Sequence, residues 1–225
     1  MDNENLVFSM NERVQKLMEK ALEYHGIENY IKALEYYSKA LKIEPNNDKI
    51  LCERCDAFVA LSQFDNAFDD INKAIEINKT ADYLNDLGGI YAEMENYEMA
   101  LTHYNAVIEI DKTNQFYYFN RAEAYFILNK FYEAIDDSTK AINLHDEDNF
   151  TIASYFLRGL SYWALKLYDK AISDFEKFDE LNYIDGNNLG KNPCIMDILE
   201  EKEGKVINLL KIKSLWSTRF GRKAK

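Results

Sequence analysis

A pattern of sixteen residues recurs five times along the chain, and this repetition limits the possible folds more than any other feature. Its copies begin at residues 30, 64, 97, 131 and 168, so that successive starts lie 34, 33, 34 and 37 residues apart. The first copy, YIKALEYYSKALKIEP, places apolar residues at the 3.6-residue period of an amphipathic helix. A repeat of this length predicts a solenoid, because one such unit cannot bury its apolar face without a neighbour.

A second, shorter pattern of eight residues precedes each copy, as in LMEKALEY at 17–24. Its fifth position always holds a small residue and its eighth an aromatic one. The small residues are Ala21, Cys55, Gly88, Ala122 and Gly159. The longer pattern adds an alanine at its fourth position: Ala33, Ala67, Ala100, Ala134 and Ala171. Because helices approach to about 8 Å only where side chains are small, we predict two helices per repeat, packed through these residues.

The spacing of the small, aromatic and alanine positions resembles the tetratricopeptide repeat. On that family's pattern the first repeat runs from Val14 to Asn47, with Pro45 near its end, and five repeats cover residues 14–184. The resemblance implies an all-α fold, a right-handed superhelical solenoid of five helix-turn-helix repeats with a C-terminal capping helix. Three additional residues near HDEDNFT predict a longer joint before the fifth repeat.

Three segments follow from this reading of the chain. Residues 1–13 form an N-terminal lead-in, and residues 14–184 form the five-repeat solenoid. Residues 185–225 comprise a Gly- and Asn-rich linker, a capping helix beginning near Pro193, and a basic tail. Solenoids need such a helix because their last repeat would otherwise expose an apolar face.

The resemblance also implies where a partner would bind, since the first helix of each pair lines a concave groove in this family. The expected groove residues are Glu53, Asp56, Asp82, Asn85, Asp86, Phe116, Phe119, Asn120, Glu123 and Phe156. This groove would be acidic in its middle and aromatic to apolar towards its C-terminal end. It would suit a peptide segment with Lys or Arg followed by apolar anchors. Alternatively, the acids form only a solvated face and the aromatic residues pack inside.

One specificity of the family can be compared residue by residue. Some chaperone-binding members hold a terminal carboxylate with a clamp of Lys, Asn, Asn, Lys and Arg spread over three repeats. Asn120 matches the middle place, but the other four places hold Asn85, Gly89, Ala153 and Leu157. We therefore expect no clamp for the carboxylate of a chaperone in this chain.

Charge is distributed unevenly along the sequence. The formal net charge is −12, yet residues 202–225 hold eight basic residues and one acid, Glu203. The basic tail is either solvated, or it binds an acidic groove in its own chain or a neighbouring copy, or it contacts an anionic surface. Because the rest of the chain is strongly acidic, we expect neither nucleic acid nor membrane as a partner. Self-association through the tail or the aromatic end remains an alternative function.

Catalysis finds little support in the sequence. Cys52 and Cys55 form a C-x-x-C pattern inside an expected helix, no second pair follows it, and the three histidines fall in different repeats. A structural zinc site would need four such ligands. We therefore expect a non-catalytic adaptor or scaffold that binds another protein, with no cofactor and no metal.

Targeting signals are equally sparse. The beginning of the chain, MDNENLVFSMNE, is polar and acidic, unlike a secretory signal, and the apolar runs are shorter than the roughly 20 residues of a membrane span. Three cysteines do not make a disulfide framework. The expected location is the cytoplasm.

Overall fold

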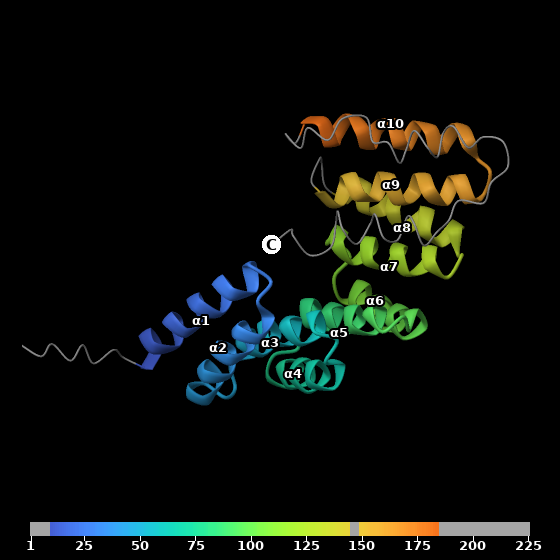
Figure 1. Ribbon diagram of the computed structural model, residues 1–225. Coiled ribbons are helices and arrows are strands. Elements are labelled where there is room, and N and C mark those ends of the chain that lie inside the picture. Colours follow the sequence, from blue (N-terminus) through green and yellow to red (C-terminus); the bar gives the residue numbers. More distant parts are fainter. Residues whose placement is uncertain (1–9, 145–148, 185–225) are drawn as a thin grey trace, which may run out of the picture. The chain divides into compact units, whose positions relative to one another are not determined.

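The computed structural model describes residues 10–144 and 149–184 of the 225-residue chain, and within them it contains ten α-helices (Figure 1). They are α1 (Met10–Gly26), α2 (Tyr30–Ile43), α3 (Asp48–Ala60), α4 (Phe64–Ile77), α5 (Ala81–Glu93), α6 (Tyr97–Ile110), α7 (Gln115–Ile127), α8 (Phe131–Leu144), α9 (Asn149–Ala164) and α10 (Tyr168–Ile184). Odd-numbered helices lead and even-numbered helices trail in five hairpins. The predicted all-α repeat architecture is confirmed. The expected capping helix and basic tail lie outside the described residues.

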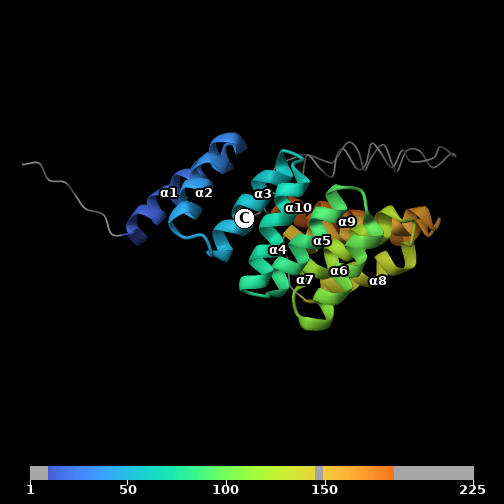
Figure 2. The same ribbon diagram turned by 90° about the horizontal axis from the view of Figure 1, so that it is seen from below.

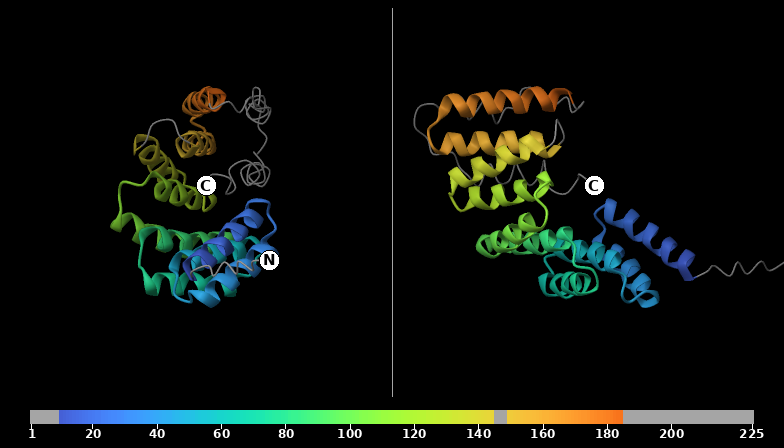
Figure 3. Two further views of the ribbon diagram at one scale, coloured as in Figure 1. Left: turned by 90° about the vertical axis from the view of Figure 1, so that its left-hand side faces the viewer. Right: turned by 180° about the vertical axis from the view of Figure 1, so that it is seen from behind.

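The helices form two compact units, residues 1–111 and 112–225. Unit 1 holds α1–α6, and the described part of unit 2 holds α7–α10. Every leading helix packs on its own trailing helix, and α3, α5 and α9 also pack on the trailing helix of the preceding repeat. The hairpins of each unit can also be followed from below and from behind (Figures 2 and 3).

Small residues lie where the two helices of each hairpin cross, as predicted. All five alanines of the trailing helices are fully buried. The two glycines of the leading helices face rings: a Cβ added to Gly88 would lie 2.7 Å from Tyr104 Cε1, and one added to Gly159 would lie 2.6 Å from Phe175 Cε1. The hairpins of repeats three and five therefore close around a ring that only glycine admits.

Each hairpin turns through one residue in the left-handed backbone region. The φ values are 60°, 56°, 61°, 59° and 61° for Glu28, Ser62, Glu95, Asn129 and Lys166, respectively. The next amide then bonds back to the leading helix, as in the 2.8 Å bond from Gln63 N to Phe58 O. This geometry is the common helix-ending motif for which glycine is the preferred residue, yet none of the five turns uses it.

Side-chain caps fix the starts of several helices. Asparagine or threonine oxygens accept a hydrogen bond from an amide in the first turn, and each bond satisfies a donor that the helix leaves unpaired. The capping residues are Asn29, Asn47, Thr80, Asn96 and Asn114.

The predicted longer joint before the fifth repeat is wrong. Helix α8 ends at Leu144 and α9 begins at Asn149, and α9 has 16 residues where α3, α5 and α7 have 13. The three additional residues therefore extend the helix at its N-terminus. Each helical residue gains a backbone hydrogen bond, and Phe150 of the added turn packs on Phe116 with ring centroids 4.8 Å apart.

Buried arginine–aspartate pairs join the helices of three hairpins. In each pair an arginine of the leading helix donates hydrogen bonds from two guanidinium nitrogens. The acceptor is the carboxylate of an aspartate sixteen residues later, in the trailing helix. The pairs are Arg54–Asp70, Arg121–Asp137 and Arg158–Asp174, with nitrogen–oxygen distances of 2.6–2.8 Å. Arg54 also donates to Ser38 Oγ of the preceding repeat at 3.2 Å, so one side chain links three helices. Such bidentate pairs fix geometry as well as adding stability.

Candidate peptide-binding face

Leading helices α3 and α5 bring four expected groove carboxylates into unit 1. Glu53 and Asp56 come from α3, and Asp82 and Asp86 from α5; we call these four residues the acidic face. The two helices meet through Cys52, whose Sγ donates a hydrogen bond to Asp86 Oδ2 at 3.3 Å. Because a side chain of α3 contacts one of the acids of α5, the two helices present these acids from neighbouring positions.

Three of these carboxylates raise the pKa of neighbouring side chains. Burial raises the pKa of the Tyr37 phenol, and the charges of Glu53 and Asp56 raise it further. Burial likewise raises the pKa of the Cys52 thiol, with additional contributions from the charges of Asp86 and Asp56. The charge of Asp56 contributes to both shifts. The thiol stays protonated at neutral pH and serves as a donor, not as a nucleophile.

A second contact between α3 and α5 was not anticipated from the sequence. Tyr83 Oη donates to Asp48 Oδ2 at 3.1 Å, and Asn78 donates to the same oxygen at 3.0 Å. These bonds lower the pKa of Asp48, chiefly through Asn78. The signal in the sequence is the 35-residue separation of Asp48 and Tyr83, close to one repeat. The Tyr83 bond joins the N-terminal ends of α3 and α5, and the Asn78 bond joins the C-terminal end of α4 to α3.

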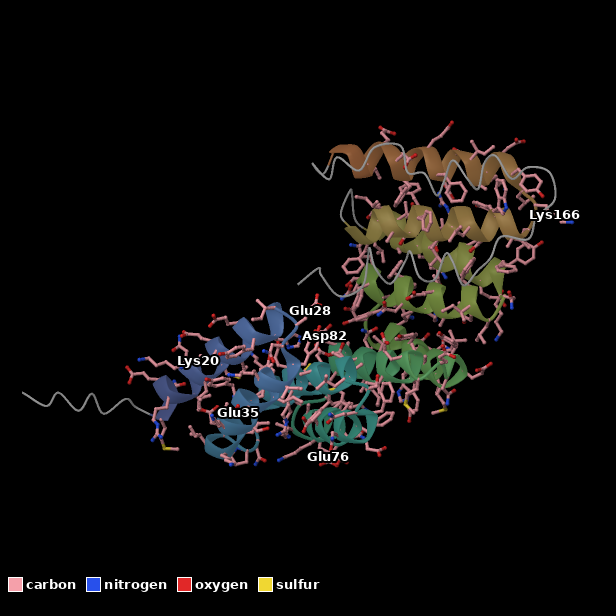
Figure 4. All side chains as sticks on the ribbon, viewed as in Figure 1. Lys20, Glu28, Glu35, Glu76, Asp82 and Lys166 are labelled. Carbon is pink, nitrogen blue, oxygen red and sulfur yellow. The ribbon has the colours of Figure 1, made fainter. Side chains whose placement is uncertain are left out.

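The expected groove residues of unit 1 differ in accessibility. Asp82 is exposed at the start of α5 (Figure 4), whereas Glu53, Asp56 and Asp86 are half-buried. Asn85 is only 3% exposed and belongs to the interior of the unit. Half-buried carboxylates interact more strongly with a cation than fully solvated ones, because less water screens them.

The aromatic groove positions of unit 2 are largely internal. Phe119 and Phe156 are each 6% exposed. Phe119 lies against Phe150 at 5.9 Å, and Phe156 lies against Phe178 at 5.0 Å. Phe119 therefore packs between α7 and α9, and Phe156 packs against α10. The surface that was expected to be open and aromatic is instead partly covered by Phe150, which belongs to the added turn of α9.

Other expected positions of unit 2 are more accessible. Phe116, Asn120 and Glu123 of α7 are half-buried. Ala153 and Leu157, which stand at two cationic places of the carboxylate clamp, are apolar and 2% exposed. These two positions provide no charge for a terminal carboxylate.

The described part of the chain offers neither a metal cluster nor a membrane-spanning helix. No cluster of three or more His, Cys, Asp or Glu side chains there could hold a metal ion. None of the described helices combines the length and the apolar character that a bilayer span requires.

Comparison with known proteins identifies the family. The tetratricopeptide repeat profile matches residues 17–47, 81–114, 117–147 and 152–185. The chain belongs to the tetratricopeptide repeat family. The α3–α4 hairpin falls between the first two matches and has the same helix pair as the other four. As an array of these repeats, the chain is a protein-interaction scaffold.

Three relatives illustrate the extent of the similarity. The chain is 32% identical over 124 residues to the dynein axonemal assembly factor 4 of Rattus norvegicus, covering 52% of this chain and 30% of that protein. It is 34% identical over 98 residues to human serine/threonine-protein phosphatase 5, covering 44% of this chain and 19% of the phosphatase. The solved structure of PilF from Pseudomonas aeruginosa has a TM-score of 0.66 at 18% identity, covering 76% of this chain and 77% of that one. The chain thus spans less than a third of the two sequence relatives.

Proposed function

We propose that this tetratricopeptide repeat protein is a non-catalytic adaptor whose acidic face binds a basic peptide segment of another protein. The observation that carries the proposal is the hydrogen bond from Cys52 of α3 to Asp86 of α5, which joins the two helices that hold these carboxylates. The charges of Glu53 and Asp56 raise the pKa of Tyr37, and those of Asp86 and Asp56 raise the pKa of Cys52, so the three acids contribute a local negative field. A Lys- or Arg-bearing segment laid along these helices would neutralise that field.

The charge of the face favours a cationic partner for a physical reason. Carboxylates that are partly buried and close together repel one another, and a bound ammonium or guanidinium relieves this repulsion while forming charge-assisted hydrogen bonds. Opposite charges also accelerate encounter, and salt weakens both effects. The proposal therefore predicts binding that weakens as ionic strength rises.

Charge reversal tests the proposal directly. A fluorescein-labelled peptide of lysines and leucines would be titrated by anisotropy against the wild type and against Glu53→Lys with Asp86→Lys. We expect the double variant to lose binding while its far-ultraviolet circular dichroism remains helical. The matched control, Asp65→Lys with Glu98→Lys, makes the same charge change at exposed positions of α4 and α6. Loss of binding in the control alone, or retained binding in the test variant, would refute the proposal.

The basic tail offers a competing occupant for the same face. Residues 202–225 lie outside the described residues, and their eight basic residues complement the acidic face in charge. Deleting residues 202–225 would then strengthen capture of the lysine peptide. Unchanged affinity would exclude the tail as an occupant. Light scattering at several salt concentrations would separate binding within one chain from self-association between copies.

A further inference from the structure

Exposed apolar side chains gather at the two hairpin turns of unit 2. Tyr132, which follows the α7–α8 turn, is 71% exposed, and Leu167 and Tyr168 of the α9–α10 turn are 41% and 43% exposed. Helices α7 and α9 pack side by side, so both turns lie at one edge of the unit (Figures 1 and 3). The turns of unit 1 also expose apolar side chains, such as Ile31 at 74% and Met94 at 45%, so the charge beside these residues is what distinguishes unit 2.

Lysines surround these apolar residues. Lys130, Lys166 and Lys170 are exposed, and none of them forms an ion pair within residues 112–144 and 149–184. Lys166 projects from the end of the unit in Figure 4. The same turns contain two acids, Glu133 and Asp169. We call Lys130, Tyr132, Lys166, Leu167, Tyr168 and Lys170 the basic turn edge.

The turns of unit 1 have the opposite charge. Their residues at and after the left-handed position include Glu28, Asp65, Glu95 and Glu98, with Lys32 as the basic residue. Position by position, Lys166 of the fifth repeat stands where the first and third repeats have Glu28 and Glu95. The hairpin turn therefore accepts either charge, and the fold does not require lysine at this place.

Aromatic and backbone contacts hold the basic turn edge in place. The ring of Tyr168 packs edge-on against Trp163 at 4.9 Å. Lys170 lies over the ring of Tyr162 at 5.4 Å, and the amide of Leu167 bonds to Tyr162 O at 2.9 Å. A surface whose side chains are already positioned loses little conformational freedom on binding.

We propose that the basic turn edge is a second docking surface, and that its partner is an acidic protein segment with apolar side chains. The three lysines complement carboxylates in such a segment, and the exposed Tyr132, Leu167 and Tyr168 provide an apolar area for its apolar side chains. An extended anionic surface would also be repelled by the net charge of −12, whereas a short acidic segment meets mainly the local field. This surface is distinct from the acidic face and does not depend on it.

The test uses the full chain and a fluorescein-labelled peptide of glutamates, leucines and phenylalanines. The charge variant is Lys130→Glu with Lys166→Glu, and it is compatible with folding because glutamate already occupies the position of Lys166 in two other repeats. We expect its dissociation constant to rise roughly fivefold or more, the combined effect of reversing two surface charges. Tyr132→Ser keeps all charges and should weaken binding at least about threefold through lost apolar contact.

The control, Ser62→Glu with Gln63→Glu, adds two negative charges at the corresponding turn of the second repeat. Peptide affinity should be unchanged in this control. The proposal is overturned if the control weakens binding as much as the charge variant, or if neither unit 2 variant changes the affinity. It is also overturned if phosphatidylserine vesicles bind the wild type while the peptide does not, because the edge would then serve a membrane.

Discussion

Replacing the left-handed turn residue Ser62 by glycine should stabilise the protein. Ser62 has φ of 56°, and its own amide and that of Gln63 bond back to Val59 O and Phe58 O at 2.8 Å. A residue with a Cβ loses about 1–2 kcal/mol in this region relative to the right-handed one. Glycine removes that strain but gains freedom in the unfolded chain. The net expectation is about 0.5–1 kcal/mol of additional stability.

Urea unfolding followed by circular dichroism would measure this gain. With a slope of about 2–3 kcal/mol per molar, the midpoint should rise by about 0.2–0.5 M. The comparison variant is Asn129→Gly at the turn of the fourth repeat, where φ is 59°. Asparagine tolerates the left-handed region better than serine does, so its replacement should gain less. A lower midpoint for Ser62→Gly, or an equal gain at both turns, would show that the turn residue does not carry the strain inferred for it.

Two further perturbations probe individual repeats. Gly159→Ala should cost about 1–3 kcal/mol because the added methyl group meets the ring of Phe175, and Phe175→Leu in the same chain should restore part of the loss in urea unfolding. His103 stacks on Tyr91 with centroids 5.2 Å apart, and burial lowers its pKa. Neutral His103 therefore stabilises the folded state fully above the unfolded imidazole pKa of about 6.5. This stabilisation is lost as the pH falls further. His103→Tyr, the residue that the first repeat carries as Tyr36, should reduce the decline of the thermal midpoint between pH 7 and pH 5; an undiminished decline would assign it to other groups.

The repeat pattern was sufficient to predict the hairpins because it is encoded by side-chain size. Ala33 and its four equivalents sit at crossings where no larger side chain fits, and all are fully buried. Gly88 and Gly159 lie at such crossings in the leading helices. Each faces an aromatic ring so closely that even a Cβ atom would clash with it. Short-range patterns of this kind are visible in one sequence because the two helices of a hairpin are neighbours along the chain.

Accessibility at the expected groove was harder to predict. The positions of Phe119 and Phe156 follow the repeat, but their exposure depends on what another helix places over them. Phe150 reaches Phe119 only because three additional residues became helical at the start of α9. Three residues that were predicted to lengthen a loop thus changed which side chains cover α7, more than thirty residues earlier in the chain. The position of a helical residue is a property of the repeat, whereas its exposure is a property of the contacts between repeats.

The arginine–aspartate pairs show a further limit of reading each repeat as equivalent. Arg54, Arg121 and Arg158 each grip an aspartate, but the third repeat has Leu87 and His103 at these two places, and the first has Lys20 and Tyr36. In both exceptions aromatic stacking replaces the ion pair: Tyr91 on His103, and Tyr24 on Tyr36 at 5.5 Å. A family pattern does not record this alternation, because it leaves the pattern of small residues unchanged. The two helices of a hairpin are thus joined by a bidentate ion pair in three hairpins and by stacked rings in the other two. A substitution that one kind of contact tolerates is therefore expected to destabilise a hairpin that uses the other kind.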